Sequence, residues 1–376
     1  MAMAVAVALP ATASADIFDL FSDDSLADGS RFAFAPSRSR PAIVAIDTQK
    51  RELAAEIEIP HTAGSVVASE GLDLLLATDP GSRSVTIVDL HTREVTARLD
   101  LGMRPDAALL NPFDRYVAFG SSSGVVVVWD MLERVEMLRV EGLETAEHMT
   151  FGVDGRNLYV VEPARKRISV IEMYERAKVA EIALGGDEDV AAEVSALSRS
   201  ADGYTGYVSV TSENRVVVID LLEWKVKRSV PVGAGPLRPY STGDNRYVLV
   251  PNRDDETLSV LSALSHDVVA TIPTGVRARE LNAGWLDTVA FIMPAEDSHI
   301  GVVDLRELTR LDAIPVPGRT DDGLVTADSR TLLASLVDDG RVAVVDARRR
   351  ELRTVIDSAA GTLEGIEIAI SNNLCH

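Results

Sequence analysis

VTIVDL, at residues 85–90, is one copy of a short pattern that returns along the whole chain: an apolar run suited to a β-strand that ends in an acidic residue. The anchor residues of the eight copies are Asp47, Asp89, Asp130, Glu172, Asp220, Ser262, Asp304 and Asp346. Successive anchors are 42, 41, 42, 48, 42, 42 and 42 residues apart. A period of about 40–50 residues, with several strands in each unit, is typical of a β-propeller.

The repeat around residues 106–140 shows how each unit is expected to fold. Apolar runs of four to six residues alternate with clusters of Gly, Pro, Asp and Ser, which is the pattern of buried antiparallel strands joined by turns. We expect four strands in this unit, at residues 106–111, 116–120, 125–129 and 135–140. The first of them would line the centre of the ring.

The two ends of the chain predict how the ring closes. Residues 31–35 match a second strand, so the first repeat lacks its inner strand. Residues 365–371, GIEIAIS, follow the last full repeat and have the pattern of an inner strand. We expect this segment to complete the first blade, which would remove exposed sheet edges. The prediction is an all-β, eight-bladed propeller, with seven blades as the alternative, and a surface loop near residues 185–190.

Composition restricts the classes of partner. The 376 residues carry a net charge of −21. Nucleic acids and anionic membranes both favour basic surfaces, so we expect neither as a partner. No run of about 18 apolar residues occurs, so membrane insertion is not expected. We predict a monomer whose partner is a small molecule or another protein.

The amino terminus has the composition of an export signal. Residues 1–15 combine an apolar stretch with the small residues Ala13 and Ala15, which is typical of a secretory signal cleaved after Ala15. An apolar tail without that role is the alternative, because the usual positive charge at the start is missing. We expect residues 16–30 to form an acidic segment and residues 31–376 a single propeller domain. The predicted location is periplasmic or secreted.

The repeats also resemble a known family. The unit V-x-V-V-D-L…V-x-x-x-I-x-x-G-x-x-P is similar to that of the YVTN-type (surface-layer, YncE-like) bacterial β-propellers, as residues 102–121 and 268–284 show. The eight units and the closing C-terminal strand are similar to the d1-haem propeller domain of cytochrome cd1 nitrite reductase. The resemblance covers the chain from about residue 30 and implies an exported propeller. It carries over no electron-transfer chemistry, because a CxxCH motif and a cytochrome c domain are absent.

Basic residues recur where the inner strands are expected to begin, at one end of the central channel. They are Arg104, His148, Arg238, Arg277, Arg279 and Arg319. Such a ring would focus a positive potential on the channel mouth of an acidic protein. Guanidinium groups pair well with carboxylates and phosphates. The sequence therefore predicts a site for a small anionic ligand, and the alternative is that these loop residues are simply solvated.

A second set of residues has the chemistry of metal ligands. Imidazole and thiolate groups bind zinc and copper, and the candidates are His61, His148, Cys375 and His376. Solvated histidines and a free thiol are the alternative interpretation. Covalent haem attachment is not expected, because Asn372 stands where the first cysteine of a CxxCH motif would be.

No motif in the sequence assigns an enzyme class. A P-loop, an H-E-x-x-H pair, a G-x-S-x-G elbow and a dinucleotide fingerprint are all missing. We therefore expect an exported, non-catalytic propeller that binds a small anionic ligand, a metal or a protein partner at one face of the channel. The alternatives are a protein that handles d1-type haem, a quinone or a metal as its cofactor, and an accessory subunit of a periplasmic oxidoreductase.

Overall fold

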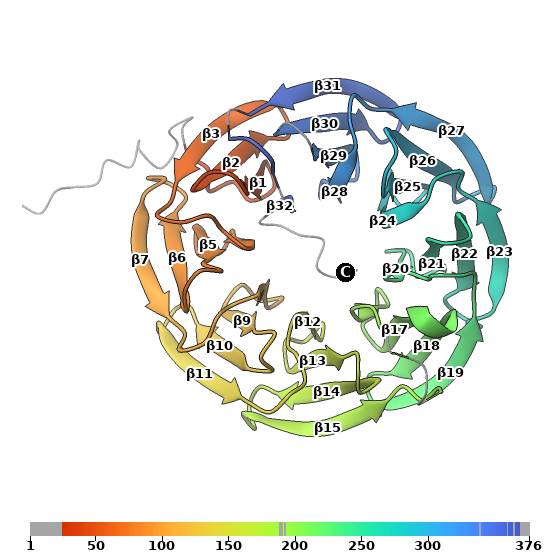
Figure 1. Cartoon of the computed structure of the whole chain (residues 1–376), viewed down its shortest axis with the longest axis horizontal. Helices are drawn as coiled ribbons and strands as arrows, with labels where there is room; N and C mark the ends of the chain where they lie inside the picture. The colour runs from red at the N-terminus through yellow and green to blue at the C-terminus, as the bar shows by residue number, and fades with distance from the viewer. Residues whose placement is uncertain are drawn as a thin grey trace, which may run out of the picture.

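The computed structural model describes residues 25–187, 191, 193–337, 340–358, 360–363 and 365–368. They form eight four-stranded antiparallel sheets, which are the blades of a closed ring around a central channel (Figure 1). The described residues contain no α-helix and one 3-10 turn, η2 (Thr211–Glu213). None of them belongs to a helix with the length and apolar character needed to span a bilayer. The eight-bladed prediction is confirmed, and the seven-bladed alternative is wrong.

Blade 1 is the blade that combines the first strands of the chain with its last strand. In each blade the strands are named from the channel outwards. Blade 1 contains β32 (Glu367–Ile368), β1 (Phe32–Pro36), β2 (Ala42–Asp47) and β3 (Glu52–Glu58), and blade 2 contains β4 (Val66–Ser69), β5 (Leu74–Thr78), β6 (Ser84–Asp89) and β7 (Val95–Asp100). Blade 3 contains β8 (Ala107–Leu110), β9 (Tyr116–Gly120), β10 (Val126–Asp130) and β11 (Val135–Val140), and blade 4 contains β12 (His148–Phe151), β13 (Asn157–Glu162), β14 (Arg167–Glu172) and β15 (Ala177–Ala183).

Blades 5 to 8 repeat the same order. Blade 5 contains β16 (Ser198–Arg199), β17 (Thr205–Val210), β18 (Arg215–Asp220) and β19 (Lys225–Pro231), and blade 6 contains β20 (Tyr240–Ser241), β21 (Tyr247–Asn252), β22 (Thr257–Ser262) and β23 (Val268–Pro273). Blade 7 contains β24 (Ala278–Gly284), β25 (Val289–Pro294), β26 (His299–Asp304) and β27 (Thr309–Pro315), and blade 8 contains β28 (Thr320–Val325), β29 (Thr331–Leu336), β30 (Arg341–Asp346) and β31 (Glu351–Asp357).

The ring closes by pairing the C-terminal strand with the first strand of the chain. In the antiparallel pair of β32 and β1, Ile368 lies opposite Ala33 and Glu367 lies opposite Phe34. The backbone N–H of Arg38 also donates to the carbonyl of Thr362 at 2.9 Å. This confirms the predicted closure, although residues 369–371 of the predicted strand lie outside the described residues.

The repeated acidic anchor has a local physical cause. In blade 1, Asp47 Oδ1 accepts the backbone N–H groups of Gln49 (3.0 Å) and Lys50 (2.8 Å). In blade 5, Asp220 does the same for residues 222 and 223. A short polar side chain that satisfies backbone donors stabilises a tight turn. The anchor therefore fixes the turn between the third and fourth strands of its blade.

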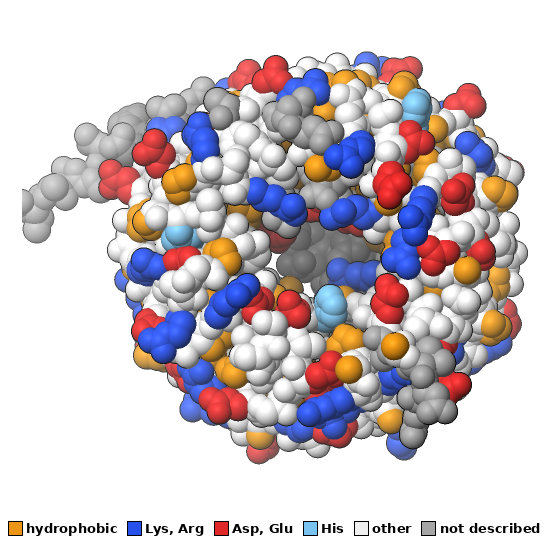
Figure 2. All heavy atoms as spheres, viewed as in Figure 1, with side chains coloured by type: hydrophobic (Ala, Val, Ile, Leu, Met, Phe, Trp, Pro, Cys, Tyr) orange, Lys and Arg blue, Asp and Glu red, His pale blue; other side chains and the backbone are white. Residues whose placement is uncertain are grey.

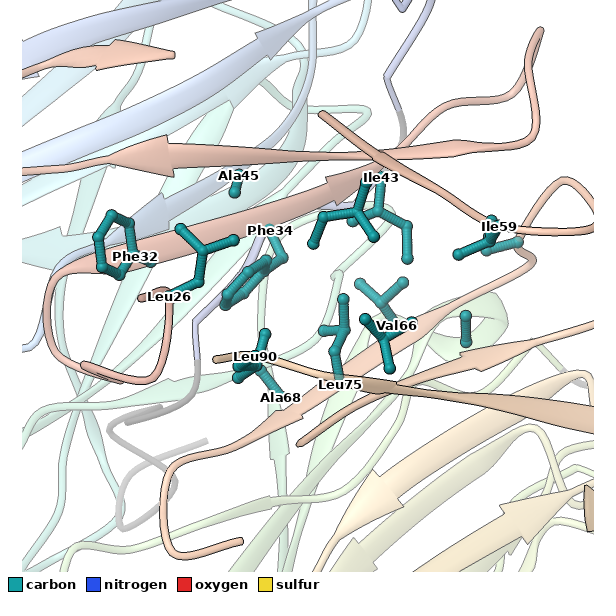
Figure 3. Packing of buried hydrophobic residues seen from close by; sticks show 14 residues of the cluster. Leu26, Phe32, Phe34, Ile43, Ala45, Ile59, Val66, Ala68, Leu75 and Leu90 are labelled. Carbon is teal, nitrogen blue, oxygen red and sulfur yellow. The ribbon is translucent and has the colours of Figure 1, made fainter. Parts of the chain in front are cut away.

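The core lies between neighbouring blades, where apolar side chains of one sheet pack against the next. Figure 3 shows the cluster between blades 1 and 2, in which Phe34 and Ile43 face Val66 and Leu75 and all four are buried. Each such side chain contributes about 1.5–3 kcal/mol by leaving water. Leu26 joins the same cluster from the segment before β1. Packing between blades thus holds the inner strands in place around the channel.

Candidate ligand-binding channel

A cavity of about 510 Å³ lies at the centre of the ring. The inner strands of all eight blades, β4, β8, β12, β16, β20, β24, β28 and β32, contribute to its wall. Figure 2 shows the opening on one face, with basic, acidic and histidine side chains around the hollow. Pockets that hold small molecules or cofactors usually measure about 300–1,000 Å³. The channel therefore has the size of a binding site for one such molecule.

One side of the cavity is apolar. Leu109 and Leu110 of β8 line it in blade 3, and Met149 and Phe151 of β12 line it in blade 4. Val67 of β4 extends the same wall into blade 2. Apolar and aromatic lining with a few placed polar groups is typical of sites for organic ligands.

The opposite wall begins with Arg238, which precedes β20 in blade 6. Its Nε donates to Ser198 Oγ at 3.2 Å and its Nη2 to the carbonyl of Leu197 at 3.4 Å. The segment that carries it is fixed, because Leu237 N–H donates to the carbonyl of Pro251 at 2.9 Å and Ser209 Oγ to the carbonyl of Leu237 at 2.6 Å. The arginine therefore holds its place at the cavity wall without a bound partner.

Electrostatics make Arg238 a candidate anion-binding group. Burial lowers the pKa of its guanidinium, while the negative charge of Glu280 opposes that effect. An arginine still keeps its charge at neutral pH. The side chain is nevertheless exposed at the cavity wall, where its guanidinium can form charge-assisted hydrogen bonds with an anion.

His148 begins β12 and precedes the apolar residues of blade 4 that line the cavity. The protein around it lowers the pKa of the imidazole by burial; Glu147 opposes this, and the positive charge of Arg238 adds to it. The histidine is therefore mostly neutral at pH 7. Its ring lies close enough to Arg238 for the positive charge of the guanidinium to disfavour protonation of the imidazole. A neutral imidazole offers one nitrogen as an acceptor or metal ligand.

Three carboxyl groups from three blades form the third side of the cavity: Glu280 of β24, Asp322 of β28 and Glu367 of β32. Backbone donors bind two of them, since Gly323 N–H donates to Glu280 Oε2 at 3.1 Å and Ile366 N–H donates to Asp322 Oδ2 at 3.1 Å. The side chains of Glu280 and Asp322 also share a hydrogen bond. The closing strand is thus joined to blade 8 through Asp322.

The protonation of these carboxyl groups differs from that of surface acids. Burial, followed by the negative charge of Asp322, raises the pKa of Glu280 well above its ordinary value. The same two causes raise the pKa of Glu367 to about 8. Glu367 is therefore largely protonated at neutral pH, so it can donate a hydrogen bond to a ligand.

The predicted basic residues divide into two groups. Arg238 and Arg279 line the cavity, and His148 stands next to its wall. Arg104 is exposed and its Nε pairs with Asp106 at 2.8 Å. Arg277 pairs with Asp254 at 3.2 Å outside the cavity. Arg319 is exposed and is also absent from the lining. Two of the six predicted cations therefore line the cavity, a third stands next to its wall, and the other three lie outside its lining.

The predicted metal ligands do not gather in the described residues. His61 Nε2 is bonded to Thr86 Oγ1 at 2.7 Å, and its Nδ1 to the carbonyl of Thr62 at 3.0 Å, away from the cavity. Cys375 and His376 lie outside the described residues. Across residues 25–368, as far as the structure describes them, no group of three or more His, Cys, Asp or Glu side chains could hold a metal ion.

Arg199 and the three carboxyl groups are not among the site residues predicted from the sequence. Arg199 lies in β16, is 2% exposed and lines the cavity in blade 5. Its strand is only two residues long, so an alternation of apolar and polar residues could not indicate which side chain faces the channel. The sequence contains 58 acidic residues, so nothing distinguished these three from the others. Glu367 comes close to Asp322 only when the ring closes.

Comparison with known proteins supports the fold. No family model and no curated protein sequence matches the chain. A solved structure described as "Dihydro-heme d1 dehydrogenase NirN in complex with DHE" is 16% identical with a TM-score of 0.75, over 92% of this chain and 77% of that chain. The structure of Kuenenia stuttgartiensis hydrazine synthase is 17% identical with a TM-score of 0.54, over 79% of this chain and 96% of that chain.

A third similar structure is a chain of the mitotic checkpoint complex, 13% identical with a TM-score of 0.58, over 72% of this chain and 86% of that chain. At these identities the similarity shows the propeller fold alone. Because one fold hosts many functions, the activity has to be argued from the channel itself.

Proposed function

We propose that the protein binds a small, flat, anionic molecule in its central channel, and that this binding is its function. The proposal rests on one observation: the same cavity has a basic wall and, facing it, an apolar wall. Arg238 and Arg279 lie on one wall, and Leu109, Met149 and Phe151 lie on the other. A ligand with carboxylates on an apolar, planar body would satisfy both.

The energies are consistent with micromolar affinity. A charge-assisted hydrogen bond contributes roughly 1.5–3 kcal/mol, and micromolar binding requires about 8 kcal/mol. Two arginines thus supply part of that free energy, and contact with the apolar wall has to supply the rest. This is why the proposal specifies a planar body and excludes a bare inorganic anion.

A d1-type haem is the first ligand to test. The arginines would hold its carboxylates, the apolar wall would contact its ring, and the imidazole of His148, next to the cavity wall, would be the candidate group to bind its iron. A bound haem of this kind supplies redox chemistry at its iron. Support for this choice comes from the fit of these residues and from the ring-wide similarity to the structure of NirN in complex with DHE.

The experiment begins with protein isolated from its own organism, examined by visible absorption and native mass spectrometry. We expect an absorbing, non-covalent ligand in the channel. The ligand-free protein is then titrated with d1-type haem and with haemin, and we expect saturable binding with a Kd of about 10 μM or below for at least one of them. A colourless native protein that binds neither macrocycle would contradict the proposal.

Export is part of the same proposal. We propose that residues 1–15 are removed on passage to the periplasm or the outside of the cell, and that the propeller, like the YVTN-type proteins its repeats resemble, works there as a monomer. Amino-terminal sequencing of the isolated protein checks this, with Asp16 as the expected first residue. An intact Met1 would contradict it.

A further inference from the structure

The blades expose two sets of turns on one face of the ring. In each antiparallel sheet, the turn between the first and second strands lies at the same end as the turn between the third and fourth strands. We call the end of the ring that carries both sets the turn face. The third-to-fourth turns follow the anchor residues, so equivalent positions can be compared from blade to blade.

The second residue after the anchor is apolar and exposed in four consecutive blades. The residues are Leu132, Tyr174, Leu222 and Leu264 in blades 3 to 6, which are 59%, 80%, 69% and 92% exposed. The equivalent residues in the other four blades are Gln49, His91, Arg306 and Arg348. Half of the turn face therefore differs from the other half at one structural position.

The first-to-second turns extend the same pattern. Phe113 of blade 3, Tyr204 of blade 5 and Leu286 of blade 7 are 65%, 52% and 74% exposed. Because these turns lie at the same end of the blades, they place further apolar side chains on the same face. We call these three residues, together with the four above, the apolar arc: it consists of Phe113, Leu132, Tyr174, Tyr204, Leu222, Leu264 and Leu286.

Folding does not require these side chains to be apolar. The residue just before each tip does the packing: Met131, Met173 and Leu221 are buried at 4%, 2% and 3% exposure. The next residue points to water, and polar residues occupy it in blades 1, 2, 7 and 8 without loss of the turn. Exposed apolar side chains that gather on one face typically mark an interaction surface.

Charges beside the arc indicate the kind of partner. Leu132 is followed by Glu133 and Arg134, and Tyr174 by Glu175 and Arg176; all four charged residues are exposed. Among the described residues, none of these four side chains takes part in an ion pair. The arc therefore presents apolar tips interleaved with charges of both signs.

This mixture of apolar and charged residues favours a partner protein over a nucleic acid, a membrane or a second copy of this chain. A nucleic acid or an anionic membrane presents charge of one sign and calls for a basic surface. A second copy of this chain would bring its own net charge of −21 to the contact. A protein surface with an apolar strip, bordered by both acidic and basic residues, matches the arc in both respects.

We propose that the apolar arc on the turn face of blades 3 to 7 is the docking surface for a partner protein of that description. Six of the seven residues of the arc lie outside the lining of the cavity, and only Leu286 of blade 7 belongs to both. The function it adds is assembly: one face of the propeller is held against another protein while the channel stays central to the ring.

The test uses a photo-reactive amino acid placed at Tyr174 in the full chain, expressed in its own organism. Gln49 is the matched control, because it occupies the equivalent exposed position of blade 1, outside the arc. We expect position 174 to cross-link to one protein, identified by mass spectrometry, and position 49 not to do so. A cross-link within the chain, to a second copy or to lipid, or no cross-link from the arc at all, would overturn the proposal.

The identified protein is then purified and its binding is measured with the wild type and with the triple variant Leu132→Ser, Leu222→Ser, Leu264→Ser. We expect Kd to rise at least about tenfold, because apolar anchors carry most of the affinity in such contacts. The control variant Gln49→Ser should stay within about twofold, and thermal melting should show that both variants fold. Equal binding by the triple variant and the wild type would overturn the proposal.

Discussion

The pKa values of carboxyl groups shift in opposite directions in different parts of this protein. At the turn of blade 8, burial alone would raise the pKa of Asp346, but the Arg349 N–H group and the Arg353 and Arg349 side chains outweigh it and lower the pKa to about 2. In the channel, burial and the charge of Asp322 raise the pKa of Glu367 to about 8. The neighbours, and not the residue type, decide whether an acid is charged.

Arg238 and Arg277 provide a matched pair for testing the channel at the scale of single residues. We expect Arg238→Ala to weaken the binding of d1-type haem about tenfold or more, because the loss of one charge-assisted contact costs roughly 1.5–3 kcal/mol. Arg277→Ala should bind like the wild type, because that side chain pairs with Asp254 outside the cavity. Absorbance titration measures both, and equal losses in the two variants would contradict the site.

The sequence could predict which residues begin the inner strands, but not which of their side chains reach the channel. The pairing of β24 with β25 shifts by one residue between Ala278 and Glu280. This bulge breaks the alternation of the strand, and Arg279 and Glu280 both line the cavity. Strict alternation would have placed them on opposite faces. For this reason Glu280 could not be predicted from the alternation of its strand.

At the scale of one element, the turn between the third and fourth strands has the same backbone conformation in all eight blades. The fourth residue after each anchor has a left-handed backbone, with φ between 53° and 63° in all eight turns. The anchor compensates by binding the free backbone N–H groups ahead of it, as Asp47 and Asp220 do. The period of the sequence was readable because this local requirement recurs, and so the fold could be predicted much better than the site.

Asp130 is the anchor for which the turn is most easily tested. Its Oδ1 accepts from residues 132 and 133 at 3.0 and 3.1 Å, and its Oδ2 accepts from Arg115 Nη2 at 2.6 Å. We expect Asp130→Ala to lower the free energy of unfolding by about 2–4 kcal/mol. Ser262→Ala, which loses one contact to Ser265 N–H at 3.2 Å, should cost only about 1 kcal/mol. Urea unfolding compares the two, and an equal cost would refute the role of the anchor.

The closing strand provides a second test at this scale. Deleting residues 364–376 removes β32, together with Ile366 and Ile368, which are 4% and 2% exposed. Lost burial alone should cost roughly 3–6 kcal/mol, and the open edge of β1 should make unfolding less cooperative. Deleting only residues 369–376 leaves β32 in place and should change both properties less. Thermal melting that is the same for the two truncations would contradict closure by β32.

At the scale of the whole molecule, the two kinds of acid act on stability at opposite ends of the pH range. Acids at the turns, such as Asp346 and Asp130, have lowered pKa values in the folded state, so the stability they contribute is lost as pH falls below about 4. Glu280 and Glu367 have raised pKa values, so the folded protein keeps protons that the unfolded chain has released. Their contribution is therefore lost as pH rises.

The consequence is a maximum of stability on the acidic side of neutrality, near pH 5. Between the ordinary pKa of 4.5 and the folded value of about 8, the unfolded chain releases the proton that Glu367 keeps in the folded protein. This should lower the free energy of unfolding by a few kcal/mol at most, because part of the side chain faces the channel. Glu367→Gln cannot release this proton, so its stability should fall less between pH 5 and pH 8. Glu307→Gln, at an exposed turn, should follow the wild type. Urea unfolding from pH 3 to pH 9 measures all three, and a wild-type stability that rises from pH 5 to pH 8 would show that the channel glutamates are charged in the folded protein.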